Sequence, residues 1–238
     1  CIRDSLTLTR RRGILTFQTQ IELFLHGGTE FKDLRRDDST RPRLAAFPIA
    51  RRLSSATFPT SMPALTQAET RALGGKVLRQ VSRSFYLTLK MLPAGMRETC
   101  SLGYLLARAS DTIADTTKAP IGTRKELLTR YRDLVQDVPV SLSEAKALHA
   151  EMNEKLKPSV DDRGEIELIE QTELCFQWLA GVTDGEYVAL RTVLGEIHKG
   201  QLNDLDLFAG SKEDDPRFLA NEDELITYTD QVAGSVGR

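Results

Sequence analysis

Helix-start signals recur along this chain from residue 66 onward, and they constrain its fold more than any other feature. Thr66 and Glu69 have the spacing of a capping box, in which the threonine caps a helix and the glutamate reaches back to it. The same spacing recurs at Thr123 and Glu126, at Ser141 and Glu144, and at Thr183 and Glu186. Repeated helix starts without any long alternation of apolar and polar residues predict an all-α fold.

Apolar residues at three- and four-residue spacing extend from these starts, and prolines mark the expected breaks. The sequence predicts helices over 66–91, 96–116, 123–136, 142–157, 163–180, 184–206 and 222–238. Asn221, followed by Glu224, is expected to open the last of them. Because 40% of the 238 residues are hydrophobic and only 6% are aromatic, we expect an aliphatic helical core. No stretch reaches the roughly 20 apolar residues that cross a bilayer.

The first 61 residues differ in character from the rest. They show no sustained helical or strand period of apolar residues, and they carry 11 lysines and arginines against six acidic residues. We expect residues 1–61 to be a disordered or non-native leader and Met62 to be the native start, with an organelle transit peptide as the alternative. Residues 62–238 are expected to form the N-terminal part of a single helical domain, truncated at its C-terminus, since a helical pattern still runs at the last residues.

Charge and cysteine content narrow the class of protein. Residues 62–238 hold 21 basic residues against 28 acidic ones, which argues against nucleic acid as a partner. Cys1, Cys100 and Cys175 form no CxxC pair, so we expect a reduced, cytoplasmic setting without disulfides or a zinc site. Peripheral association with a membrane surface and the oligomeric state stay open.

The strongest chemical signal is the segment Tyr104-Leu-Leu-Ala-Arg108-Ala-Ser-Asp111-Thr-Ile-Ala-Asp115. On a helix, Asp111 and Asp115 lie one turn apart on the same face, where their like charges repel. A hard cation such as Mg²⁺ relieves this repulsion, and Arg108 shares the face with a fork suited to phosphate oxygens. A lone pair at this spacing is more often a solvated helix face. The leucines around this pair favour burial, and buried charges need partners.

Three further segments are each weak in isolation. The run Ser82-Arg83-Ser84-Phe85 can hold phosphate oxygens beside an apolar space. The segment that contains Gln201 and Asp204, and the segment Tyr228-Thr-Asp-Gln-Val-Ala-Gly-Ser-Val-Gly, read first as helix-packing seams. Small residues at 233–235 allow close helix approach or leave room for a bulky ligand.

Taken together, the four segments resemble the squalene/phytoene synthase family in their order and approximate spacing, over about residues 77–238. The sequence around Asp111 most resembles that of squalene synthases, and the chain as a whole most resembles the bacterial type. The resemblance implies an isoprenoid-synthase-type helical bundle around a central apolar cavity. It also implies a transferase that condenses two prenyl diphosphates head to head, from farnesyl diphosphate through presqualene diphosphate to squalene.

The resemblance also implies roles for particular residues. Asp111 and Asp115 match the first aspartate-rich motif, which holds Mg²⁺ against the substrate diphosphate, and Tyr228 matches a tyrosine that acts near the carbocation or in proton transfer. Further residues match groups that contact the diphosphate or face the prenyl cavity. These are Ser82, Arg83, Ser84 and Arg108 for the diphosphate, and Phe85, Tyr104, Gln201 and Asp204 for the cavity. NADPH is implied where the product is squalene, although the sequence shows no dinucleotide fingerprint.

Two departures from the family pattern set further expectations. Position 114 is alanine where some members carry an acid, and the second aspartate-rich motif of the family is not present in these 238 residues. We therefore expect residues 1–238 on their own to be inactive. The alternatives are phytoene synthesis from geranylgeranyl diphosphate and a non-catalytic relative that acts as an assembly or binding module.

Overall fold

The computed structural model describes residues 65–208 and 217–232, and within these ranges every regular element is helical. The expected leader over 1–61, the end of the predicted helix 222–238 and the small residues at 233–235 lie outside the described residues. The first elements are α3 (Gln67–Ala72), the π-helical η2 (Leu73–Val77), α4 (Leu78–Ser82), α5 (Phe85–Met91), α6 (Ala94–Asp115) and α7 (Ile121–Gln136). They are followed by α8 (Leu142–Glu151), η3 (Met152–Leu156), η4 (Lys157–Ser159), α9 (Arg163–Glu170), α10 (Thr172–Ala180), α11 (Asp184–Leu207) and α12 (Glu222–Val232).

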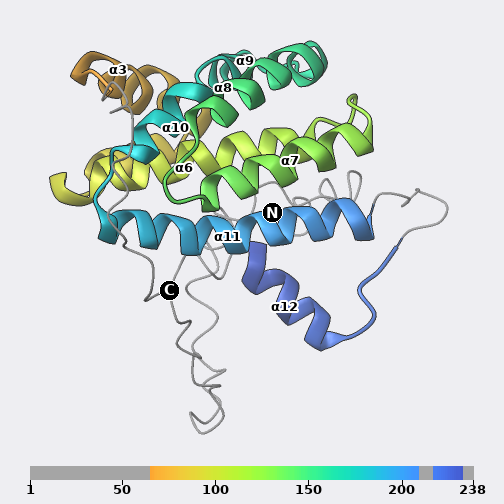
Figure 1. Ribbon diagram of the computed structural model, residues 1–238. Coiled ribbons are helices and arrows are strands. Elements are labelled where there is room, and N and C mark those ends of the chain that lie inside the picture. Colours follow the sequence, from red (N-terminus) through yellow and green to blue (C-terminus); the bar gives the residue numbers. More distant parts are fainter. Residues whose placement is uncertain (1–64, 209–216, 233–238) are drawn as a thin grey trace, which may run out of the picture.

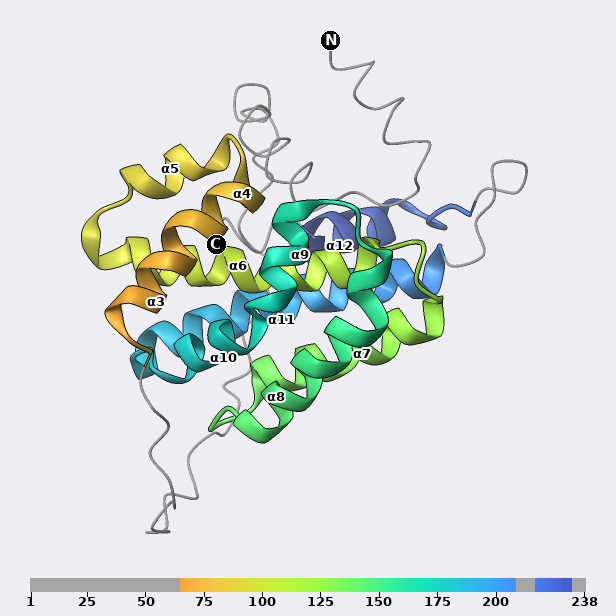
Figure 2. The same ribbon diagram turned by 90° about the horizontal axis from the view of Figure 1, so that it is seen from above.

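Helix α6 lies at the centre of the bundle. It packs against α5, α7, α9, α10 and α11, and Figures 1 and 2 show these helices around it. Leu102, Leu105 and Leu106 are fully buried along it, and Ile113 continues the buried face into its last turn. Burial of each such side chain contributes about 1.5–3 kcal/mol, so α6 is fixed firmly in the core. The acidic residues at its C-terminal end are therefore carried on a rigid element.

The capping signals are confirmed at most of the predicted helix starts. Thr66 and Thr183 form complete capping boxes, and Ser141 accepts a hydrogen bond from the backbone N–H of Glu144. Asn221 likewise accepts from the backbone N–H of Glu224, at 2.9 Å. The prediction at Thr123 is wrong, because α7 already begins at Ile121, directly after a proline whose fixed φ suits a helix start.

Two of the predicted helices are interrupted. The helix predicted over 66–91 breaks at Arg83, whose φ of 45° is rare for a residue with a side chain. The helix predicted over 163–180 divides at Gln171 into α9 and α10. The break at Arg83 separates α4 from α5 and places the arginine on the surface rather than on a helix face.

No helix among the described residues is long and apolar enough to cross a membrane. The all-α prediction is confirmed, while the central apolar cavity and the C-terminal truncation stay predictions.

Candidate active site

Asp111 and Asp115 lie in the last turns of α6, as the sequence predicts. Asp111 is 3% exposed, and its carboxylate accepts a hydrogen bond from Arg108 at 2.5 Å. Arg108 is itself largely buried, since its side chain keeps 11% of its exposure. The i, i+3 spacing thus brings a cation directly against the first carboxylate of the pair.

Asp115 is less well compensated than Asp111. Its Oδ1 atom is buried and has no hydrogen-bond partner among the described residues. Burial, reinforced by the negative charge of Asp111, raises the pKa of Asp115 well above its ordinary value, although Arg108 acts in the opposite direction. A carboxylate held in this way has an unmet need for positive charge or a proton.

Glu165 completes this group, and the sequence analysis does not find it. It lies in the first turn of α9, and its carboxylate accepts a very short hydrogen bond from the second terminal nitrogen of Arg108. Burial raises the pKa of Glu165, and the charge of Arg108 opposes that effect. The guanidinium is therefore shared between a carboxylate of its own helix and the carboxylate of Glu165, which lies 57 residues further along the chain on α9.

Asp204 and Tyr228 form a second polar pair, between α11 and α12. The Tyr228 hydroxyl is hydrogen-bonded to the carboxylate of Asp204, while the Oδ1 atom of Asp204 is buried without a partner among the described residues. Burial raises the pKa of Asp204 to about 7, and the hydrogen bond from Tyr228 opposes the rise. Burial also raises the pKa of Tyr228. The charge of Asp111 also raises the pKa of Asp204, and that of Asp115 raises the pKa of Tyr228, so this pair lies near the carboxylates of α6.

The predicted aromatic pair is also brought together. Phe85 from α5 stacks on Tyr104 from α6, with their ring centroids 5.4 Å apart. The Tyr104 hydroxyl donates to the carbonyl of Val81 at 3.3 Å, and burial raises the pKa of Tyr104 to about 12. Arg108 lowers that pKa and Asp111 raises it, so the aromatic pair adjoins the carboxylates.

The remaining predicted residues differ in their exposure to solvent. Ser82 is fully buried and its hydroxyl donates to the carbonyl of Leu78 at 2.5 Å, which directs it into the helix rather than toward a ligand. Arg83 and Ser84 are exposed at the break between α4 and α5. Gln201 is buried on α11, and its Oε1 atom has no partner among the described residues.

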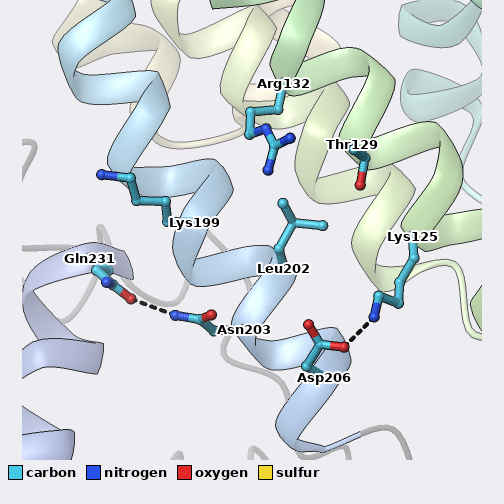
Figure 3. A pocket seen from close by; sticks show the side chains of 8 residues that line it. All are labelled: Lys125, Thr129, Arg132, Lys199, Leu202, Asn203, Asp206 and Gln231. Carbon is cyan, nitrogen blue, oxygen red and sulfur yellow. Dashed lines mark hydrogen bonds and ion pairs between the residues drawn. The ribbon is translucent and has the colours of Figure 1, made fainter.

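A separate pocket of about 380 Å³ lies between α7, α11 and α12 (Figure 3). Its lining consists of Lys125, Thr129, Arg132, Lys199, Leu202, Asn203, Asp206 and Gln231. Lys125 pairs with Asp206, and Asn203 donates to Gln231 at 2.9 Å across its floor. None of the predicted site residues lines it. A mostly charged and amide lining does not suit an apolar prenyl chain, so this pocket is distinct from the candidate active site.

Within residues 65–208 and 217–232, no group of three or more histidine, cysteine, aspartate or glutamate side chains is arranged to hold a metal ion. Asp111 and Asp115 are a pair of carboxylates rather than such a group. Two carboxylates with substrate phosphates are nonetheless an ordinary ligand set for Mg²⁺, which needs no all-protein cage.

Asp204 is expected to make stability depend on pH. Its pKa of about 7 in the folded protein exceeds the unfolded value near 3.9, so the native state holds the extra proton between these values. The stabilising effect of this proton is therefore fully present below about pH 4 and is lost progressively as the pH rises from about 4 to about 7. In urea unfolding with chelator, the stability of Asp204→Asn relative to the wild type should be higher at pH 8.5 than at pH 5 by about 2–3 kcal/mol.

Asp206→Asn is the matched control, since Asp206 is exposed on the same helix and pairs with Lys125. It should show no such pH-dependent gain. If the stability difference between Asp204→Asn and the wild type were the same at both pH values, Asp204 would titrate as an ordinary surface acid.

The fold and these residues together define a class of protein. It is an all-helical bundle whose central helix carries carboxylates and an arginine that are largely shielded from solvent. The model of one family, described as squalene/phytoene synthase, matches residues 78–238. The chain therefore belongs to the squalene/phytoene synthase family, as the sequence resemblance predicts.

Curated relatives agree with this family assignment over a shorter stretch. The squalene synthases of Solanum lycopersicum and Nicotiana benthamiana are each 36% identical over 61 residues, which is 26% of this chain and 15% of each relative. Squalene synthase BSS of Botryococcus braunii is 35% identical over 69 residues, 29% of this chain and 15% of that protein. The aligned region thus spans about a seventh of the relatives' length. No solved structure matches the chain significantly. The likeness to bacterial squalene synthases stays a prediction.

Proposed function

We propose that this chain carries the diphosphate-ionising site of an enzyme that joins two farnesyl diphosphates head to head, giving presqualene diphosphate and then squalene. The observation that carries the proposal is the buried group formed by Arg108, Asp111 and Asp115 on the central helix of a squalene/phytoene synthase family member. Structural ion pairs ordinarily leave no buried carboxylate oxygen without a partner, whereas a site that awaits a ligand does.

Asp111 and Asp115 are the residues that would hold Mg²⁺. The fit rests on the partnerless Oδ1 atom of Asp115, on the charge of two carboxylates one turn apart, and on oxygen as the donor atom. When bound there, Mg²⁺ would supply positive charge to the leaving diphosphate.

Arg108 would bind the diphosphate beside these carboxylates. Its Nε atom is buried without a partner among the described residues, so the guanidinium keeps donor capacity beyond its bonds to Asp111 and Glu165. Arg83, exposed at the break before α5, would approach the same anion from the rim. The stacked rings of Phe85 and Tyr104 would border the prenyl chain, where each aromatic face stabilises a nearby cation by about 0.5–2 kcal/mol.

Asp204 and Tyr228 would manage the proton of the reaction. Joining two farnesyl diphosphates into presqualene diphosphate releases one diphosphate and one proton. The Tyr228 hydroxyl can accept that proton while its own passes to the hydrogen-bonded carboxylate of Asp204. A pKa of about 7 allows Asp204 to take up and release a proton near neutrality.

The test is product analysis by gas chromatography and mass spectrometry, with protein from the complete coding sequence that contains this chain. Farnesyl or geranylgeranyl diphosphate is supplied with Mg²⁺, with and without NADPH. We expect squalene with farnesyl diphosphate and NADPH, and presqualene diphosphate without NADPH. Omission of Mg²⁺ with chelator present should abolish both products.

Other products would redirect the proposal. Phytoene from geranylgeranyl diphosphate would establish the alternative substrate, whose chain length is set by cavity depth rather than by the carboxylates. A folded protein that gives no product from either substrate would reject the enzymatic proposal in favour of a non-catalytic binding module. Turnover by residues 1–238 alone would contradict our expectation that these residues are inactive by themselves.

A further inference from the structure

The first turn of α9 departs from the usual pattern of a helix start. Asp162 caps the helix, and its Oδ1 atom accepts from the backbone N–H groups of Gly164 at 2.8 Å and Glu165 at 3.1 Å. At this spacing a glutamate ordinarily reaches back to the capping residue. The Glu165 side chain instead crosses to α6 and pairs with Arg108. Its interaction is therefore directed at the candidate site rather than at its own helix end.

Glu165 and Asp111 hold Arg108 from two directions. One terminal nitrogen of the guanidinium donates to Asp111 at 2.5 Å, and the other donates to Glu165. Charge-assisted bonds at both ends of the fork fix the plane of the guanidinium. A free arginine side chain would lose its rotamer freedom only when a ligand bound, at a cost to affinity. Here the two carboxylates already order the guanidinium.

The position of Glu165 is fixed in turn by close backbone packing. Gly164 is buried, and a Cβ atom added there would lie 3.2 Å from the carbonyl carbon of Gln80 in α4. The α9 turn thus rests directly on α4, one turn before Arg83. An Asp162 carboxylate oxygen lies 3.9 Å from the Arg83 guanidinium. One acidic turn therefore faces both arginines that the resemblance assigns to the diphosphate.

We propose that Glu165 is a positioning residue, which together with Asp111 holds the Arg108 guanidinium in the orientation that receives the substrate diphosphate. Glu165 does not itself contact the substrate. The proposal rests on the proposed function, because it assumes that a prenyl diphosphate binds at Arg108. Its rival is a structural ion pair that ties α9 to α6 and leaves ligand binding unaffected.

Calorimetric binding measurements with Mg²⁺, on the protein from the complete coding sequence that contains this chain, distinguish the two. The probes are farnesyl thiodiphosphate, which resists ionisation, and inorganic diphosphate, which lacks the prenyl tail. We expect Glu165→Ala to weaken both probes about tenfold, because the guanidinium must then be ordered on binding. Glu165→Gln keeps a hydrogen-bond acceptor of the same length and should recover a large part of the loss.

Glu167→Ala is the matched control. Glu167 lies on the same helix and also makes a single ion pair to another helix, with Lys76 at 2.7 Å. Its loss should leave both affinities unchanged. In an Arg108→Ala background, Glu165→Ala should have no further effect on either probe, since a positioning residue acts only through the residue that it positions.

Each outcome separates the two proposals. Wild type that binds neither probe rejects the proposed function, and the positioning role with it. Wild type that binds both, with Glu165→Ala indistinguishable from Glu167→Ala, rejects the positioning role alone. Equal effects of Glu165→Ala with and without Arg108 would do the same. If Glu165→Ala does not fold, Glu165→Leu replaces it, because leucine keeps an apolar side chain but offers Arg108 no acceptor. An affinity of Glu165→Leu equal to that of the wild type would overturn the proposal.

Discussion

Asp115→Asn is expected to stabilise the metal-free protein while lowering prenyl transfer by about 10²–10³-fold. The gain in stability follows because a buried carboxylate oxygen without a partner, beside the charge of Asp111, disfavours the folded state at neutral pH. An amide removes that charge and should raise the free energy of unfolding by about 1–2 kcal/mol at pH 8. The loss in activity follows because the amide cannot supply the carboxylate that we propose for Mg²⁺.

Two measurements check this pair of effects: urea unfolding in the presence of chelator, and product formation by the protein from the complete coding sequence. Asp161→Asn is the control, because Asp161 is an exposed aspartate that pairs with Lys118. It should leave both activity and stability near those of the wild type. A stabilised Asp115→Asn that retains full activity would show that Asp115 is a strained structural residue rather than a metal ligand.

Stability and activity oppose each other at this position for a physical reason. We expect the partnerless Oδ1 atom of Asp115 to cost folding free energy and, under the proposed function, to be available to a cation. Asp111 differs, because Arg108 already pairs with it. The two aspartates of the motif are thus unequal, which their identical chemistry in the sequence does not indicate.

Helix starts could be predicted from the sequence because capping is decided within about four residues. Thr66 and Thr183 show this directly, since each meets its glutamate in a reciprocal hydrogen-bonded box. The spacing of Asp111 and Asp115 is likewise a local property, and the helix places both as predicted. The error at Thr123 arises where an upstream proline starts the helix earlier.

Contacts between distant segments could not be predicted in the same way. The local signal at Glu165 is a capping spacing to Asp162, which indicates a role at its own helix end, and the contact with Arg108 overrides it. The break at Arg83 has no glycine or proline to mark it, so no local signal in the sequence indicates it. The burial of Ser82, whose hydroxyl donates to the carbonyl of Leu78, could likewise not be predicted from its neighbours in the sequence, and its predicted role at the diphosphate stays a prediction.

Arg108→Met is expected to destabilise the metal-free protein by about 3–5 kcal/mol at pH 8. Methionine keeps the length and apolar volume of the side chain but removes the cation that Asp111 and Glu165 share. Two largely buried carboxylates then lose their partner, and breaking a buried pair costs more than the pair itself contributes. Chemical unfolding with chelator present measures the loss directly.

Arg130→Met is the matched control, because Arg130 also lies between two glutamates, Glu144 and Glu151, but its side chain is 35% exposed. Its loss should cost at most about 1 kcal/mol, since water screens the carboxylates that remain. The penalty for Arg108→Met should also shrink as the pH falls toward about 4, because a carboxyl left in the bundle without its cation takes up a proton more readily than it does in the unfolded chain. Burial raises the pKa of Glu165 even beside Arg108, so this carboxyl should take up its proton readily once the cation is gone. Two results would contradict the prediction: equal losses for the two arginine variants, or a penalty for Arg108→Met that does not change with pH. Either would show that the carboxylates of Asp111 and Glu165 are solvated, so that the buried charge group proposed for the site does not exist in solution.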